Sequence, residues 1–147
     1  MGQRAKGWFA RYDFGARRGT GVLYLTHTIR GEVLKTTLDG KVLWRLGTPK
    51  LPKIYAKKNE YHPTSVAVAS SAEFFVADGY GKSVILHYSK DRKLLGTFGG
   101  WGGKPGQMRV PHGLYIDRYA GKEELLVADR ENTVCSASVS RGCGSIN

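Results

Sequence analysis

The stretch HPTSVAVASSAEFFVADGYGKSVILHYSKDRKLLGTFG, from His62 to Gly99, contains four short apolar runs separated by turn residues. Each run is rich in valine, isoleucine, leucine, phenylalanine or tyrosine, a composition and length typical of β-strands. No helical periodicity of useful length competes with this pattern. The stretch therefore predicts four antiparallel strands, at Ser65–Val68, Phe74–Ala77, Val84–Tyr88 and Leu94–Phe98.

The same pattern recurs along the chain with a period of 51 residues. The segments LYLTH, FFVAD and LLVAD begin at Leu23, Phe74 and Leu125, and the apolar runs around them repeat with nearly the same spacing. A four-stranded unit that recurs every ~50 residues is the signature of a β-propeller blade. The repeat predicts blade units at residues 15–47, 62–99 and 110–132, followed by an irregular tail at 133–147.

A chain of 147 residues has room for about two and a half such blades. Propellers close with ~4 to 8 blades, because each blade buries its two faces against its neighbours. We therefore expect an all-β chain that is part of a larger propeller, or one that associates with other chains to cover its open edges.

The letters Gly-Lys-Ser at residues 81–83 also end the phosphate-binding loops of many nucleotide-binding proteins. Such a loop needs a glycine five residues before the Gly-Lys pair, so that its backbone can curl around a phosphate. Val76 occupies that position, which excludes the motif. The letters are better explained as the turn between the second and third strands of the blade, where Gly79 and Gly81 supply backbone freedom.

The chain carries a formal net charge of +11 and has a pI near 9.8. Such a charge helps a protein to approach anionic partners, although the lysines and arginines are spread along the chain rather than gathered in a tail. No apolar run is long enough for a membrane span, and no secretory signal is recognisable. Cys135 and Cys143 lack the spacing of a metal-binding pair.

Several motifs between His62 and Asn132 resemble a known family. They are Pro-Thr-x-Val-Ala-Val, Val-x-Asp-Gly-Tyr, Pro-Gly-Gln, Val-Pro-His and Val-Ala-Asp-Arg-Glu-Asn, in that order. In this order and spacing they resemble two successive blades of the NHL-repeat propellers. Among these, the segment is most similar to the catalytic domain of the peptidyl-α-hydroxyglycine α-amidating lyases and their bacterial relatives. The resemblance implies a six-bladed NHL propeller as the parent fold.

The resemblance also implies an activity and a set of residues. The lyases of this family cleave a peptidyl-α-hydroxyglycine into a peptide amide and glyoxylate, with zinc held by three histidines. By motif, His112 corresponds to a zinc ligand, Tyr80 to the tyrosine that takes the proton of the substrate hydroxyl, and Arg130 to an arginine that contacts this tyrosine or the substrate carboxylate. The parent's substrate would be small, and peptide-like or hydroxylated. The resemblance allows calcium in the parent and suggests a secreted or extracytoplasmic location.

Each of these residues has a structural alternative. His112 follows a proline and could bond the backbone of a turn, while Tyr80 and Arg130 lie in equivalent turns that non-catalytic NHL propellers also contain. His27 occupies the position of the repeat aspartates, which indicates divergence of its blade rather than a metal site, and His62 and His87 are expected at the surface. These residues could therefore have structural roles in a propeller that is not an enzyme.

Two departures from the family limit what this chain is expected to do. The segment FARYDFGARRGTG, at Phe9–Gly21, has no histidine where the first zinc ligand is expected, so the isolated chain is expected to be inactive. The tail after Asn132 also departs from the family, and our hypothesis is a shift of reading frame at this point, which resequencing would test. In that case Cys135 and Cys143 are accidental.

The main alternative function is a non-catalytic NHL binding platform. Its partner would be a protein, a polysaccharide or RNA, recognised through the basic charge and through Trp101, Tyr80 and Phe98. The platform would need no zinc and would bind polyanions in a salt-dependent manner. A third interpretation is that the chain is a product of gene prediction with no function of its own.

Overall fold

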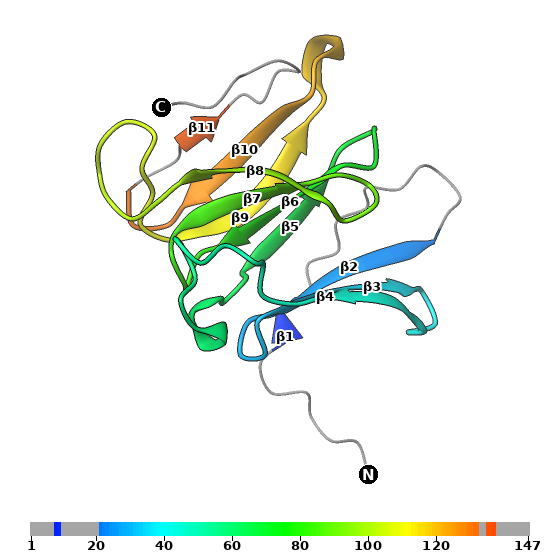
Figure 1. The fold of residues 1–147 in the computed structure, drawn as a ribbon. Coiled ribbons are helices and arrows are strands. Elements are labelled where there is room, and N and C mark those ends of the chain that lie inside the picture. The colour runs from blue at the N-terminus through cyan, green and yellow to red at the C-terminus, as the bar shows by residue number, and fades with distance from the viewer. Residues whose placement is uncertain (1–7, 10–20, 133–134, 138–147) are drawn as a thin grey trace.

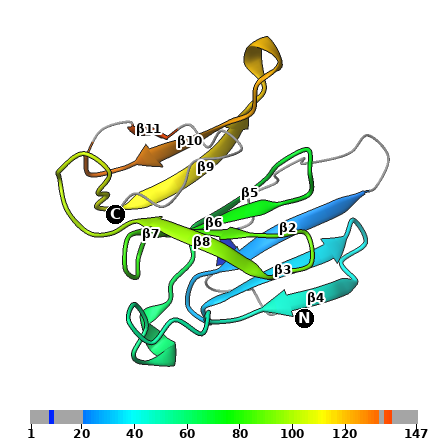
Figure 2. The same cartoon turned by 45° about the horizontal axis from the view of Figure 1, so that its top comes forward.

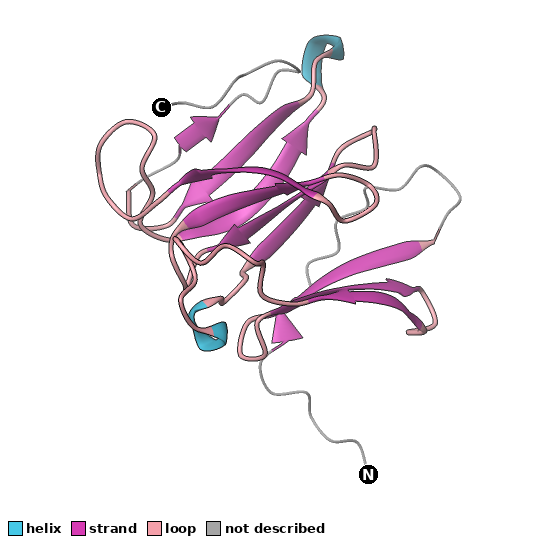
Figure 3. Cartoon of the chain, in the orientation of Figure 1, coloured by secondary structure: helices cyan, strands magenta, loops and turns pink. Residues whose placement is uncertain are grey.

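The structure is a computed structural model that describes residues 8–9, 21–132 and 135–137. Its regular secondary structure is almost entirely β-strand, arranged in three antiparallel sheets (Figure 3). Two 3-10 helices of one turn, η1 (Lys58–Glu60) and η2 (Tyr119–Gly121), lie in connections between strands. No helix among the described residues has the length and apolar character needed to cross a membrane.

The first two sheets have four strands each, and the third has three (Figure 1). The first sheet contains β1 (Trp8–Phe9), β2 (Val22–His27), β3 (Glu32–Thr37) and β4 (Val42–Leu46) in sequence order. The second contains β5 (Ser65–Val68), β6 (Phe74–Asp78), β7 (Val84–Tyr88) and β8 (Leu94–Gly99). The third has the order β11 (Cys135–Ala137), β10 (Glu124–Asp129), β9 (Pro111–Asp117).

The strands predicted from the repeat are confirmed. The four expected strands of the best unit agree with β5 to β8 within one residue at each end. The segments that define the period form β2, β6 and β10, which are the second strands of their sheets. The fold is therefore all-β, with three neighbouring sheets arranged like the blades of a propeller (Figure 2).

Two details differ from the predicted boundaries. The first sheet includes β1, which precedes the expected unit at residues 15–47 and pairs with β2. The third sheet includes β11 within the segment that was expected to be irregular, and Leu125 of β10 lies opposite Ala137. A third strand on β10 satisfies backbone groups that would otherwise form an open sheet edge.

The hydrophobic core consists of two layers, one on each face of the second sheet. On β6, Phe74 and Val76 belong to the layer shared with the first sheet, whereas Phe75 and Ala77 belong to the layer shared with β9 and β10. Because successive side chains of a strand point to opposite faces, a strand between two sheets is apolar along its whole length. This explains the uninterrupted run FFVA in the sequence.

Burial decreases from the inner to the outer strand of the second sheet. All four residues of β5 are buried, and this strand contacts β9 of the third sheet and β2 of the first. In β8 the residues are exposed or half-buried. The inner strands thus join the blades, and the loops that enter and leave them at one end of the sheets carry the residues considered next.

Candidate functional site

The three residues predicted from the family resemblance meet at one end of the second and third sheets. Tyr80 lies in the turn between β6 and β7, Arg130 follows β10, and His112 is the second residue of β9. The Nη1 atom of Arg130 donates a hydrogen bond to the Oη atom of Tyr80, at 3.0 Å. The Nε2 atom of His112 lies 3.0 Å from the same Tyr80 Oη atom. Residues 32 and 50 positions away from Tyr80 thus contact a single phenol oxygen.

The rings of the cluster are also in contact. The imidazole of His112 meets the ring of Tyr80 edge-on, with centroids 5.4 Å apart, and the Arg130 guanidinium lies over that ring at 5.4 Å. Tyr80 remains 40% exposed, so the cluster lies at the surface of the protein. Because Arg130 only donates, a Tyr80 hydroxyl that accepts from it can donate its own proton to a neutral His112 Nε2.

The turn that carries Tyr80 is held by the buried carboxylate of Asp78. Its oxygens accept hydrogen bonds from the backbone N–H of His62, from the backbone N–H of Lys82 and from the hydroxyl of Tyr55, each at 2.7 Å. Burial raises the pKa of the Asp78 carboxyl, while these donors act in the opposite direction. Burial and the nearby Asp78 carboxylate raise the pKa of the Tyr55 phenol. Asp78 thus connects the turn that carries Tyr80, through Lys82, to the segment that precedes β5, through His62.

Asp129 has the same role in the third sheet. Its two oxygens accept hydrogen bonds from the backbone N–H groups of Arg109, at 2.9 Å, and Val110, at 2.7 Å. The next residue, Arg130, donates its backbone N–H to the carbonyl of Val110 at 2.9 Å. The repeat aspartates therefore bind the loop that leads into the first strand of their own sheet, and so place Arg130 next to β9.

Close backbone packing fixes Tyr80 relative to His112. The Oγ1 atom of Thr64 donates to the carbonyl of Pro111 at 2.8 Å, and it accepts a hydrogen bond from the N–H of Gly79 at 3.3 Å. A Cβ atom on Gly79 would overlap the Pro111 carbonyl oxygen, so only glycine fits at this point. Gly79 precedes Tyr80 and Pro111 precedes His112. Thr64 therefore connects the backbone segments that carry the Tyr80 and His112 side chains.

The Gly-Lys-Ser letters have structural roles in this turn. The ammonium group of Lys82 pairs with Glu60 at 2.8 Å, and the hydroxyl of Ser83 donates to the carbonyl of Arg109. Ser83 adopts a left-handed backbone conformation with φ of 57°. These contacts agree with the interpretation of the segment as a turn.

The described residues do not fit a zinc site with three protein ligands. No group of three or more histidine, cysteine, aspartate or glutamate side chains comes together among them. His27 is buried and His62 and His87 are half-buried, so the last two are less exposed than expected. The His27 imidazole accepts from the Arg30 N–H, the His62 imidazole contacts the Thr28 carbonyl, and the His87 imidazole contacts the Glu73 carboxylate. His112 is thus the one imidazole that the described residues bring to Tyr80.

The loop between β8 and β9 lies beside the turn that carries Arg130. The side-chain amide of Asn132 donates to the carbonyl of Gly102 at 2.7 Å. Within the loop, Met108 donates its N–H to Gly100 at 2.8 Å, and Gly102 donates to Met108 at 2.9 Å. These bonds hold Trp101 at the surface, where 71% of the residue is exposed.

Comparison with known proteins relates the sequence of this chain to enzymes of peptide amidation. No model of a known protein family matches the sequence. Over 73 residues the chain is 41% identical to "Peptidyl-alpha-hydroxyglycine alpha-amidating lyase 2" of Drosophila melanogaster, and over 75 residues it is 43% identical to "Peptidyl-glycine alpha-amidating monooxygenase" of Mus musculus. The homologues of this chain are amidating enzymes.

Further comparisons extend the similarity in sequence and in fold. The chain is 35% identical over 102 residues to "Peptidyl-alpha-hydroxyglycine alpha-amidating lyase 1" of Drosophila melanogaster. It spans 8% to 18% of the lengths of these three relatives. A crystal structure of a protein of unknown function from Bacteroides caccae aligns with 92% of the chain and 47% of its own, with a TM-score of 0.50 and 17% identity, which shows the fold alone.

Sequence reasoning selected the three residues that meet but missed those that position them. Asp78 and Asp129 stand at equivalent places in the repeat, each ending a second strand, and this equivalence was the available signal. The sequence also did not single out Arg109, whose backbone N–H bonds Asp129, because a single arginine in a loop forms no recognisable pattern. Motif resemblance therefore selected Tyr80, His112 and Arg130, while the residues that position them come from the structure.

Proposed function

We propose that this chain forms blades of an amidating-lyase-like propeller that acts on a peptide ending in α-hydroxyglycine. The products would be the peptide amide and glyoxylate. The observation that supports this most strongly is the cluster at Tyr80, where His112 and Arg130 each lie 3.0 Å from one phenol oxygen. The similarity to two lyases and a monooxygenase of peptide amidation supports the same substrate class.

The proposed reaction needs a base at the substrate hydroxyl. Tyr80 Oη takes the hydroxyl proton, the oxygen's electron pair forms the C=O bond of glyoxylate, and the C–N bond breaks. The departing nitrogen gains the proton that Tyr80 Oη took from the hydroxyl and becomes the primary amide of the peptide. Arg130 donates to Tyr80 Oη and so stabilises negative charge on that oxygen, and its remaining N–H groups suit the substrate carboxylate.

His112 can act in one of two ways in this proposal, because a neutral imidazole has a single acceptor nitrogen. Its Nε2 atom lies within hydrogen-bonding distance of Tyr80 Oη, so a neutral imidazole can accept the phenol proton. By resemblance it would instead be a zinc ligand in the complete propeller, together with two ligands that the described residues do not supply. We accordingly propose that the 147-residue chain alone is inactive as a lyase.

A graft tests the function in a complete propeller. Residues 62–132 replace the matching segment of the Drosophila lyase 2, and glyoxylate release from a peptidyl-α-hydroxyglycine is measured together with bound zinc. We expect the graft to release glyoxylate and His112→Ala to abolish both zinc binding and release. Arg130→Ala should lower kcat/KM about 10-fold or more, because it removes a charged donor.

The matched control for the graft is Tyr119→Phe, because Tyr119 is 84% exposed on η2, away from the cluster. This variant should retain the activity of the graft. A folded graft without activity, or a graft in which His112→Ala changes nothing, would contradict the proposal. The non-catalytic binding platform would then be the better account.

A further inference from the structure

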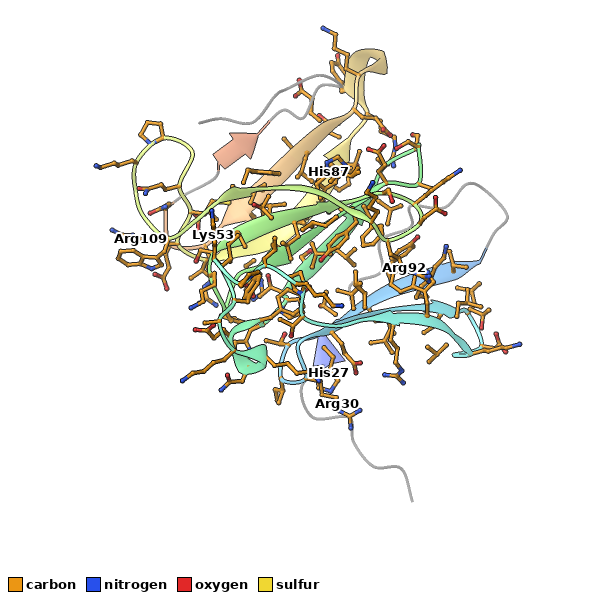
Figure 4. All side chains as sticks on the ribbon, in the orientation of Figure 1. His27, Arg30, Lys53, His87, Arg92 and Arg109 are labelled. Atoms are coloured by element: carbon orange, nitrogen blue, oxygen red, sulfur yellow. The ribbon has the colours of Figure 1, made fainter. Side chains whose placement is uncertain are left out.

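A second feature at the same end of the sheets is the pair formed by Trp101 and Arg109. The guanidinium carbon of Arg109 lies 5.9 Å from the centroid of the Trp101 ring. Both residues are exposed, and Figure 4 shows Arg109 at the outer side of the loop that precedes β9. An indole beside a guanidinium offers a flat apolar surface next to five N–H donors.

The backbone beneath this pair is held by several hydrogen bonds. Trp101 forms an isolated bridge with Met108, whose own side chain is buried, and Gln107 donates its N–H to the carbonyl of Lys104 at 2.9 Å. A Cβ atom on Gly102 would overlap the side chain of Gln107. The indole is therefore presented by an ordered loop, which reduces the entropy that a ligand must overcome on binding.

A second arginine–tryptophan pair shows what a structural pair looks like in this protein. Arg92 lies over Trp44 at 5.5 Å, but the Trp44 ring packs against Tyr24 at 5.6 Å and Phe74 at 5.7 Å. Core packing therefore explains that indole. Trp101 has no comparable role, because 71% of it is exposed.

Arg109 also has no carboxylate partner at ion-pair distance within the described part of the chain. Arg45, Lys82, Arg118 and Arg130, in contrast, each lie within 3.9 Å of a glutamate oxygen. A guanidinium held over an exposed indole and lacking an internal carboxylate is suited to accept one from a ligand.

The pair is linked to the Tyr80 cluster through its backbone. The N–H of Arg109 bonds Asp129, which immediately precedes Arg130, and the loop carbonyl of Gly102 bonds Asn132. Arg109 also precedes His112 by only three residues. An extended peptide advances about 3.3 Å per residue. A bound peptide would therefore need only a few residues to extend from the Tyr80 cluster to the loop that carries Trp101.

We propose that Trp101 and Arg109 form an accessory site for the peptide segment that precedes the reacting residue, and that this site selects an acidic side chain. The inference rests on the proposed function in placing the reacting residue at Tyr80. A glutamate or aspartate carboxylate pairs with the Arg109 guanidinium while its neighbouring atoms pack on the indole. The net charge of +11 attracts such acidic peptides to the protein.

Binding of peptide amides to the 147-residue chain tests this site without requiring catalysis. Two fluorescein-labelled peptide amides of equal length are compared by anisotropy, one with glutamates and one with glutamines at positions two to four residues before the amide. We expect the acidic peptide to bind about 10-fold more tightly in wild type, as one charge-assisted bidentate contact allows. Arg109→Gln should remove most of that preference, and Trp101→Ala should weaken both peptides about 5-fold.

Arg92→Gln is the matched control, because it removes the same charge from another arginine that lies over a tryptophan. It should leave both affinities within about twofold, since rim charges alone act weakly. The proposed site would be overturned if Arg109→Gln and Arg92→Gln changed the peptide affinities equally. It would also be overturned if Trp101→Ala bound both peptides with wild-type affinity. Tighter binding of a uridine oligonucleotide than of the acidic peptide at matched charge would also overturn it, in favour of RNA.

Circular dichroism and thermal midpoints verify that each variant is folded. If Trp101→Ala does not fold, Trp101→Phe takes its place in the binding assay. The outcome is separable from the lyase proposal. Peptide selection by Arg109 with an inactive graft would contradict the lyase function alone. An active graft without Arg109-dependent selection would contradict the accessory site alone.

Discussion

Removal of the Asp78 carboxylate should destabilise the fold more than any other single loss of a carboxylate in the described sheets. Asp78→Ala leaves three donors without an acceptor: the N–H groups of His62 and Lys82 and the hydroxyl of Tyr55. A buried donor without a partner costs about 1 to 3 kcal/mol. The two N–H groups are part-buried, so water replaces part of their loss, whereas the hydroxyl is buried.

Relief of the buried carboxylate's desolvation offsets part of this cost, since burial raises the pKa of Asp78. We therefore expect Asp78→Ala to lower the free energy of unfolding by about 2 to 4 kcal/mol. Asp78→Asn keeps one acceptor and should cost about half as much. Urea unfolding at pH 7, followed by tryptophan fluorescence, measures both variants.

Asp129 and Asp91 provide graded controls. Asp129→Ala removes an acceptor from two backbone N–H groups and should cost about 1 to 2 kcal/mol. Asp91 is exposed in the turn between β7 and β8, and its replacement by alanine should change stability by less than about 0.5 kcal/mol. An Asp78→Ala variant as stable as Asp91→Ala would refute the role assigned to the repeat aspartates.

Three further predictions concern the core, the acid stability and the link between the sheets. Phe74→Ala should lower the free energy of unfolding by about 3 to 5 kcal/mol in urea, because Phe74 is fully buried and stacks on Tyr88 at 5.1 Å; a loss below about 1 kcal/mol would contradict the packing. The hydrogen bond from Lys82 lowers the pKa of Glu60 from 4.5 to about 2, so its stabilisation is present above pH 4.5 and is lost as the pH falls towards 2. Glu60→Gln should flatten this acid dependence of the urea midpoint, and an unchanged pH profile would count against the ion pair. Thr64→Val should cost about 1 to 3 kcal/mol in the same assay, since it removes two buried hydrogen bonds, one to Pro111 of the neighbouring sheet and one from Gly79 of its own sheet, and a neutral effect would show that the bonds are dispensable.

The fold followed from the sequence because every blade repeats one local pattern. The apolar run at β6 and the glycine-rich turn after it specify strand, turn and strand within a few residues, and the 51-residue period fixes their order. The ends of the chain were less predictable, since β1 and β11 are short strands of two and three residues. Strands of this length carry too few residues for an alternating pattern to be recognised.

The site followed from the sequence only in part. Motif resemblance selected Tyr80, His112 and Arg130, and their convergence on one oxygen depends on contacts between sheets that no local pattern encodes. Thr64, for example, reads as an ordinary strand-flanking residue, yet its hydroxyl bonds the backbone of Pro111, 47 residues away. The sequence offered Trp101 only as a contact residue of the alternative binding platform, and its pairing with Arg109 became visible only in the three-dimensional arrangement.

The kcat of Tyr80→Phe in the graft tests the central claim most directly. Phenylalanine keeps the ring and its contact with His112 while removing the oxygen that Arg130 and His112 approach at 3.0 Å. If Tyr80 is the base, kcat for glyoxylate release should fall about 10²- to 10⁴-fold, and the Tyr119→Phe graft should keep its kcat. A Tyr80→Phe graft that releases glyoxylate at the rate of the unmodified graft would contradict the account.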